Sequence, residues 1–324
     1  MELPGESTSG GAPLRARLDV RKTYKLFLGG AFPRSESGRV YPVTDSGGSF
    51  LAHAALASRK DARDAVTAAR GAFATWSGAT AYNRGQVLYR VAEVMEGRRA
   101  QFAAEVAGAQ GLDDAAAGTV VDAAIDRWVW YAGWTDKLAQ VAGAANPVAG
   151  PYFNLSVPEP TGVVAVLAPQ ACSLLGLVSV LAPVLVAGNT AVVLASQTRP
   201  LPAVTLAEVL ATSDLPGGVV NLLTGSTAEI APWLASHEDV DALDLAGAAP
   251  LPGSPAAVDW GALEAAAAAT LTRVVRPAGD VPSSGPVGNE TTGAVEPDWT
   301  ATPNGPARAL AFTETKTVWH PKGR

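Results

Sequence analysis

The feature that most constrains the fold lies in the middle of the chain. Residues 163–168 form a short β-branched run, and residues 174–186 form an apolar segment of helical length that Gly188 and Asn189 end. Residues 190–194 form a second β-branched run. β-Branched residues favour strands, and a Gly-Asn pair commonly ends a helix. The order strand, helix, strand predicts one βαβ unit with parallel strands.

The same alternation continues toward the C-terminus. Helical patterns at 201–212 and 226–236 alternate with short apolar runs at 219–224 and 242–245, after which the alternation stops. Short buried strands that alternate with helices pair in parallel through right-handed crossovers. The sequence therefore predicts an α/β fold, a Rossmann-like open parallel sheet with flanking helices.

Segments before this core read mainly as helices. A strand is predicted at 24–28, followed by helices at 60–76, 83–106 and 122–142. The last of these carries an aromatic cluster that either packs in the core or forms a ligand platform, and core packing is the favoured interpretation. Its members are Trp128, Trp130, Tyr131 and Trp134.

Two distant segments predict a small antiparallel ribbon. Residues 151–158 alternate weakly between prolines, which belong on sheet edges. A helix at 259–275 and a proline-studded linker at 276–306, expected to be disordered, lead to a strand at 310–319. A lone strand beyond a linker must pair with something already built, so we expect it to join the ribbon.

Composition excludes several classes of function. The apolar share of 48% supports a core, and the net charge of −6 without a basic block argues against a nucleic-acid partner. One cysteine and three scattered histidines predict neither an intrachain disulfide nor a metal site. Residues 163–187 are long and uncharged enough to span a membrane, but Pro169 and Pro183 interrupt them, which favours a buried strand and helix. The polar N-terminus has no signal-peptide pattern, and we expect a cytoplasmic protein.

Several motifs occur in an order that resembles one known family. They include Leu26-Phe-Leu-Gly-Gly, Glu159-Pro-Thr-Gly-Val, Ala187-Gly-Asn-Thr and Leu215-Pro-Gly-Gly-Val-Val-Asn. Together they resemble the cofactor-binding half of the aldehyde dehydrogenase superfamily. The last strand is similar to that family's C-terminal oligomerisation strand, and residues 152–157 are similar to the hairpin with which that strand pairs.

This resemblance implies a division of the chain. Residues 23–150 and 162–250 correspond to the dinucleotide-binding domain, and residues 151–161 and 309–321 to the oligomerisation ribbon. Residues 1–22 are expected to be a flexible tail. Residues 251–308 are expected to hold only a helix and a disordered linker, where the family places a catalytic domain.

The resemblance also implies that the catalytic residues are missing. The position of the family's oxyanion-hole asparagine is Ala171, and the turn serine that meets the pyrophosphate is Ala248. The lysine that grips the ribose, the Glu-Leu-Gly-Gly motif of the general base and the nucleophilic cysteine motif have no counterpart. Cys172 is a possible substitute nucleophile, but a thiol in an apolar segment without a base or cationic neighbour favours a packing role.

A degenerate cofactor site is still implied, with weak NAD(P) binding or none. Its residues are Ala168, Pro169, Ser196, Gly225, Ser226 and Gly247. Glutamates 264, 290 and 296 lie outside any recognisable motif and are expected to be solvated.

Three functions remain open. The favoured hypothesis is a catalytically inactive structural or regulatory subunit that assembles with itself or with a full-length aldehyde dehydrogenase paralogue. The second is an NAD(P)-dependent aldehyde oxidoreductase with an atypical site. The third is a nucleotide-sensing module.

Overall fold

The structure, a computed structural model, describes residues 20–248, 256–276, 297–303 and 305–322. Its centre is a five-stranded parallel sheet in the order β10-β9-β6-β7-β8. The predicted strands are β6 (Val163–Leu167), β7 (Thr190–Leu194), β8 (Val220–Leu223) and β9 (Ala242–Asp244), and every residue in them is buried. The predicted open parallel sheet is confirmed.

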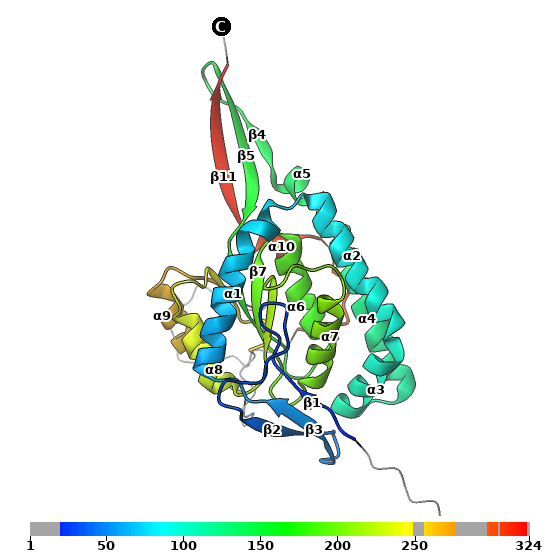
Figure 1. Cartoon of the computed structure of the whole chain (residues 1–324). Helices are drawn as coiled ribbons and strands as arrows, with labels where there is room; N and C mark the ends of the chain where they lie inside the picture. Colours follow the sequence, from blue (N-terminus) through cyan, green and yellow to red (C-terminus); the bar gives the residue numbers. More distant parts are fainter. Residues whose placement is uncertain (1–19, 249–255, 277–296, 304, 323–324) are drawn as a thin grey trace, which may run out of the picture.

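Helices cover both faces of this sheet (Figure 1). The predicted apolar segment is α6 (Leu175–Val186), in which every residue is buried. It packs with α7 (Leu201–Ala211) on one face, while α8 (Thr227–Ala235) lies on the other. Burial on all sides explains the uncharged sequence of α6. No helix among the described residues is long and apolar enough to cross a membrane.

The helices before the sheet differ from the prediction in their boundaries. Helix α1 (Arg59–Gly78) is close to its predicted range, but the single helix predicted at 83–106 is wrong. It divides into α2 (Ala81–Gly97) and α3 (Arg99–Gln110), because the backbone of Arg98 leaves the helical region with ψ 14°. The Arg98 guanidinium instead binds Glu208 on α7, at 2.6 Å.

The helix predicted at 122–142 begins earlier and ends earlier. Helix α4 spans Asp114–Ala132, and the side chain of the preceding residue, Asp113, caps it by accepting from the amide of Ala116. A separate short helix, α5 (Leu138–Ala142), follows. The fully buried Trp128 belongs to the same core cluster as α6. Tyr131 is also buried, and Trp130 and Trp134 are partly buried against this core, so core packing is the confirmed interpretation of the aromatic cluster.

A small sheet near the N-terminus has no counterpart in the prediction. Its strands are β1 (Thr23–Tyr24), β2 (Val40–Thr44) and β3 (Phe50–Ala55), in the order β1-β3-β2. The strand predicted at 24–28 is therefore too long. Beyond Tyr24 the predicted strand makes two isolated bridges, of Leu28 with Ala31 and of Phe27 with Leu222 of β8. The bridge to Leu222 is the one that reaches the central sheet. This bridge attaches the small sheet to the edge of the central one.

The prediction that the βα pattern stops after residue 245 is also wrong. The helix predicted at 259–275 ends early, as α9 (Trp260–Ala268), and Leu271 adopts a φ of 58°, which is incompatible with helix continuation. The next residues form β10 (Arg273–Val275), which pairs in parallel with β9. The sheet thus gains a fifth strand from a stretch expected to hold only a helix and a linker.

The predicted antiparallel ribbon is present. Strand β11 (Thr313–Pro321) pairs along its whole length with β5 (Tyr152–Pro160), and β4 (Ala144–Asn146) pairs with the other edge of β5. This ribbon projects away from the body of the molecule (Figure 1). The short helix α10 (Ala307–Leu310) precedes it, and Phe312 between them is fully buried.

Most of the predicted flexible tail at 1–22 and most of the predicted linker at 276–306 lie outside the described residues. In the described part of the second stretch one side chain is buried, while its neighbours Asp298 and Thr300 are exposed. Trp299 is only 9% exposed and belongs to the main core cluster.

Candidate functional site at the carboxyl edge of the sheet

The strand order places a topological switch point between β6 and β9. The chain passes from β6 to β7 and β8 on one side, and then crosses to β9 and β10 on the other. In open parallel sheets, ligands bind at such a point, beyond the carboxyl ends of the strands. All six predicted cofactor positions lie in the loops at this edge: Ala168, Pro169, Ser196, Gly225, Ser226 and Gly247.

The loops that follow β6 and β9 approach one another closely at the switch point. A Cβ atom on Gly247, in the loop after β9, would lie 2.2 Å from the carbonyl oxygen of Leu167 and 2.2 Å from the nitrogen of Pro169. Only glycine can occupy this position without moving the loop after β6. The two backbones are thus in direct contact at this point of the edge.

Gln170 joins the loops that follow β6 and β7. Its Nε2 donates to the carbonyl of Ala168 (3.0 Å), and its Oε1 accepts from the amide of Gln197 (2.9 Å). Ser196 Oγ donates to the carbonyl of Gln170 (2.9 Å) and accepts from the amide of Arg199 (3.2 Å). The hydroxyl of Ser196 is therefore committed to holding the two loops together.

The amino terminus of α8 is occupied by the chain's own side chains. Gln197 Oε1 accepts from the amide of Thr227 (3.0 Å), and Ser226 Oγ accepts from the amide of Glu229 (3.3 Å). Free amides at a helix N-terminus are what normally attract a phosphate. A pyrophosphate at α8 would have to displace Gln197. Sequence reasoning missed this role because it depends on a contact between two loops.

A buried ion pair lies beneath this edge, and sequence reasoning missed it as well. Asp244, the last residue of β9, is fully buried, accepts from the amide of Ala246 (2.9 Å) and pairs with Arg308 of α10. Burial raises the pKa of Asp244, and the charge of Arg308 offsets part of that rise. The one sequence feature that could have indicated this ion pair is an aspartate at the end of an apolar strand.

Cys172 lies in the loop before α6. Its Sγ accepts from the amide of Gly176 (3.2 Å) at the start of α6. Burial lowers the pKa of Arg127 on α4, and Tyr131 and Cys172 offset part of that change. Arg127 is itself buried and donates to Ser179 Oγ (2.6 Å) and to the carbonyls of Trp299 (3.1 Å) and Ala301 (3.0 Å).

The histidines and glutamates considered as acids or bases lie on other elements than the loop of Cys172. His53 is on β3, His237 follows α8 and His320 is on β11. Glu264 on α9 pairs with Arg276, so it is not simply solvated, while glutamates 290 and 296 lie outside the described residues. Within the described ranges, no group of three or more His, Cys, Asp or Glu side chains is placed to hold a metal ion.

Fold and site together define an α/β protein with a Rossmann-like open parallel sheet. The sequence profile described as "Aldehyde dehydrogenase family" matches residues 32–251. This chain belongs to the aldehyde dehydrogenase family.

Two curated relatives show how much of a full-length protein the match covers. Cytosolic 10-formyltetrahydrofolate dehydrogenase of Mus musculus is 35% identical over 71% of this chain and 26% of its own length. Retinal dehydrogenase 2 of Gallus gallus is 32% identical over 76% of this chain and 50% of its own length. The chain therefore spans between a quarter and a half of these relatives.

Solved structures agree on the fold. HpcC from Thermus thermophilus superposes with a TM-score of 0.72 at 27% identity, over 79% of this chain and 48% of that one. An aldehyde dehydrogenase from Bacillus cereus gives a TM-score of 0.71 at 25% identity, over 79% of this chain and 50% of that one.

Proposed function

We propose that this chain is a catalytically inactive, structural or regulatory subunit of the aldehyde dehydrogenase family. It assembles through the β11-β5-β4 ribbon with another copy of itself or with a full-length aldehyde dehydrogenase. We also infer a cytoplasmic location, for which the cytosolic relatives are the support.

The observation that carries this proposal is the exposed ribbon. Strand β11 has a neighbour only on its β5 side in the described sheet, so its other edge offers unpaired backbone groups. Four large apolar side chains on β5 and β11 remain 36–58% exposed: Tyr152, Phe153, Leu155 and Trp319. An edge and an apolar surface of this kind are suited to pairing with a strand of another subunit.

The contacts at the carboxyl edge of the sheet support the proposal that the chain is catalytically inactive. Gln170, Gln197 and Ser196 use the donors and acceptors that a dinucleotide would need, and the loops after β6 and β9 are in contact at Gly247. The combined test is light scattering of the purified chain, alone and mixed with a full-length aldehyde dehydrogenase encoded by the same organism. The assembly role would be overturned if the chain elutes with a scattering mass of 33.0 kDa, the mass of one chain, both alone and in the mixture, and none of it elutes with the full-length enzyme.

The isolated chain is expected to oxidise no aldehyde. Alanine at 171, the position of the family's oxyanion-hole asparagine, offers no side-chain hydrogen-bond donor to a developing oxyanion. The measurement is NAD(P)H formation with a panel of aliphatic, aromatic and retinoid aldehydes. Turnover by the pure chain that is lost in Cys172→Ser would contradict this prediction.

Weak NAD(P) binding is expected in calorimetry. Because Gln197 and Ser226 already occupy the first amides of α8, we expect a Kd no tighter than about 1 mM, or about −4 kcal/mol. The Gln197→Ala variant frees the amide of Thr227 and should bind NAD+ at least as well as the wild-type chain. A micromolar Kd for the wild type would instead favour the nucleotide-sensing function.

A second candidate is an NAD(P)-dependent aldehyde oxidoreductase with an atypical site. The support for this candidate is that the similar curated proteins are named as dehydrogenases. The aldehyde assay with Cys172→Ser separates this candidate from the inactive subunit.

A further inference from the structure

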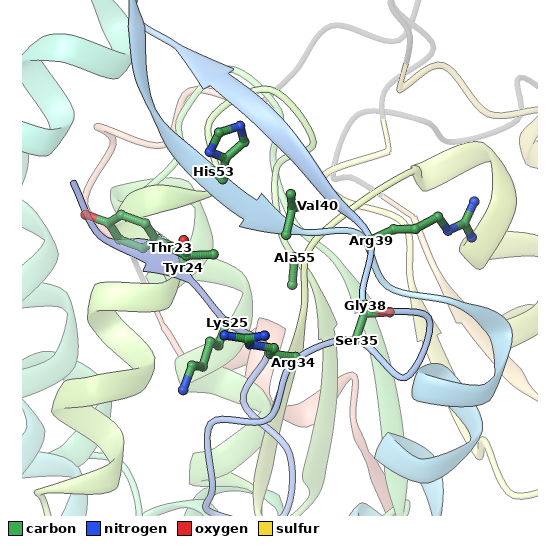
Figure 2. A pocket seen from close by; sticks show the side chains of 10 residues that line it. All are labelled: Thr23, Tyr24, Lys25, Arg34, Ser35, Gly38, Arg39, Val40, His53 and Ala55. Atoms are coloured by element: carbon green, nitrogen blue, oxygen red, sulfur yellow. The ribbon is translucent and has the colours of Figure 1, made fainter. Parts of the chain in front are cut away.

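A basic pocket lies beside the small N-terminal sheet and shares no residue with the carboxyl-edge site. It encloses about 230 Å³ between β1, β3 and the loop at residues 34–40 (Figure 2). Its lining includes Lys25, Arg34, Arg39 and His53 and contains no acidic residue. The pocket thus reverses locally the sign of a chain whose net charge is −6.

Two cations that line this pocket, Lys25 and Arg34, are not neutralised by the protein. Within the described parts of the chain, neither Lys25 nor Arg34 makes a side-chain hydrogen bond or an ion pair. Arg39 Nε reaches only the hydroxyl of Ser37, at 3.4 Å. Most other exposed cations of this protein do have carboxylate partners, as Arg99 has in Asp122. Unpaired cations that line one cavity favour the approach of an anion.

The carboxylates close to the pocket are already engaged elsewhere. Asp61 accepts hydrogen bonds from Ser35 Oγ (2.7 Å) and from the amides of Glu36 (3.0 Å) and Ser58 (2.8 Å). Glu36 pairs with Lys60 at 3.4 Å. These carboxylates stabilise the start of α1, so their charges are held by partners other than the pocket cations.

The orientation of the side chains indicates which groups would hold a ligand. Figure 2 shows Lys25 and Arg34 at the same end of the pocket, with His53 on the strand above. The ammonium of Lys25 lies at the outer rim of that end, and the guanidinium of Arg39 is directed away from the pocket. A guanidinium donates two parallel hydrogen bonds to an oxyanion, and an ammonium adds a point charge. This combination suits a tetrahedral oxyanion with several acceptor oxygens.

We propose that this pocket binds a phosphate group, with Arg34 and Lys25 as its principal ligands. The phosphate is either free inorganic phosphate or the phosphate monoester of a small molecule. Both sources share the doubly charged oxyanion that these side chains recognise. The site is independent of the carboxyl-edge site and of any dinucleotide bound there.

The test is calorimetric titration of the full chain at low ionic strength, because salt screens exposed charges. The probes are inorganic phosphate and glycerol 3-phosphate, with sodium chloride at matched ionic strength as the blank. We expect saturable binding of at least one probe, weakened about tenfold or more in Lys25→Gln/Arg34→Gln through the loss of two charge-assisted hydrogen bonds. The ratio of the two affinities identifies the source of the phosphate.

A matched control removes the same charge elsewhere. Arg90→Gln/Lys137→Gln alters two side chains that are 53% and 54% exposed, and it should bind phosphate within about twofold of the wild type. A second measurement needs no variant: phosphate should slow the acetylation of Lys25, but not that of Lys137, by mass spectrometry. Absence of saturable binding, or equal weakening in both double variants, would overturn the proposal.

Discussion

Replacement of Arg308 by methionine is expected to destabilise the folded chain by about 3–5 kcal/mol, the typical cost of removing one partner from a buried ion pair. Asp244 is fully buried at the end of β9, and Arg308 is the cation that its side chain pairs with. The Arg308 guanidinium also lies 5.9 Å from the centre of the Trp299 ring, so its loss weakens the packing of residues 297–303. Denaturant unfolding followed by tryptophan fluorescence and circular dichroism measures the change.

The double variant Asp244→Asn/Arg308→Met is the informative control. It removes both charges, so it should recover a large part of the stability lost in Arg308→Met. Arg90→Met, at an exposed pair on α2, should change the stability by less than about 1 kcal/mol. If Arg308→Met is no more destabilising than Arg90→Met, the ion pair has no structural role.

The pH dependence of stability gives an independent check on Asp244. Burial raises its pKa in the folded chain, so folded Asp244 keeps its proton to a higher pH than unfolded Asp244, whose pKa is about 3.9. Between these two values the folded state binds more protons, and the contribution of Asp244 to stability falls as the pH rises. In Asp244→Asn the free energy of unfolding should no longer fall with rising pH over this range. An unchanged profile in the variant would contradict the raised pKa.

Two lysines on the ribbon should abolish assembly and leave the fold intact. Phe153 and Trp319 are 47% and 58% exposed, so Phe153→Lys/Trp319→Lys should cost little stability in the single chain. Exposed lysines on edge-forming strands oppose pairing between sheets. We expect light scattering to show a single chain for this variant and an assembly for the wild type, with both melting cooperatively.

Two aromatic residues on a helix provide the matched control. Tyr82 and Tyr89 on α2 are 67% and 49% exposed, and Tyr82→Lys/Tyr89→Lys makes the same change of charge and loses two aromatic rings. This variant should assemble like the wild type. If both double variants assemble alike, the ribbon is not the interface. If both fall apart, the effect comes from net charge.

The ribbon test is sharper than truncation of the C-terminus. A chain ending before residue 308 would lose Phe312 and Ala309, which are fully buried, together with the partner of Asp244. Loss of a buried phenylalanine alone typically costs about 3–5 kcal/mol. Such a truncation would destabilise the core as well as remove the interface, so its effect on assembly could not be assigned.

The amino-acid sequence by itself determined the parallel sheet and the ribbon. The β-branched runs of β6 and β7 and the all-apolar α6 encode a buried βαβ unit through local periodicity, which needs no knowledge of distant residues. The pairing of β11 with β5 followed from a simple need, since a strand beyond a linker must find an edge. The strand β10 was missed because only three residues form it, after the positive φ of Leu271.

Tertiary structure alone decided the state of the candidate site. The same six positions that the family resemblance indicated do meet at one edge, but the donors around them are taken by Gln170 and Gln197. The side-chain oxygens of Gln170 and Gln197 accept from backbone amides 27 and 30 residues further along the chain, and Asp244 pairs with Arg308, 64 residues away. The periodicity of apolar residues predicts which face of a helix or strand is buried. It does not predict which side chains in two different loops form a hydrogen bond, because that depends on how close the folded chain brings them.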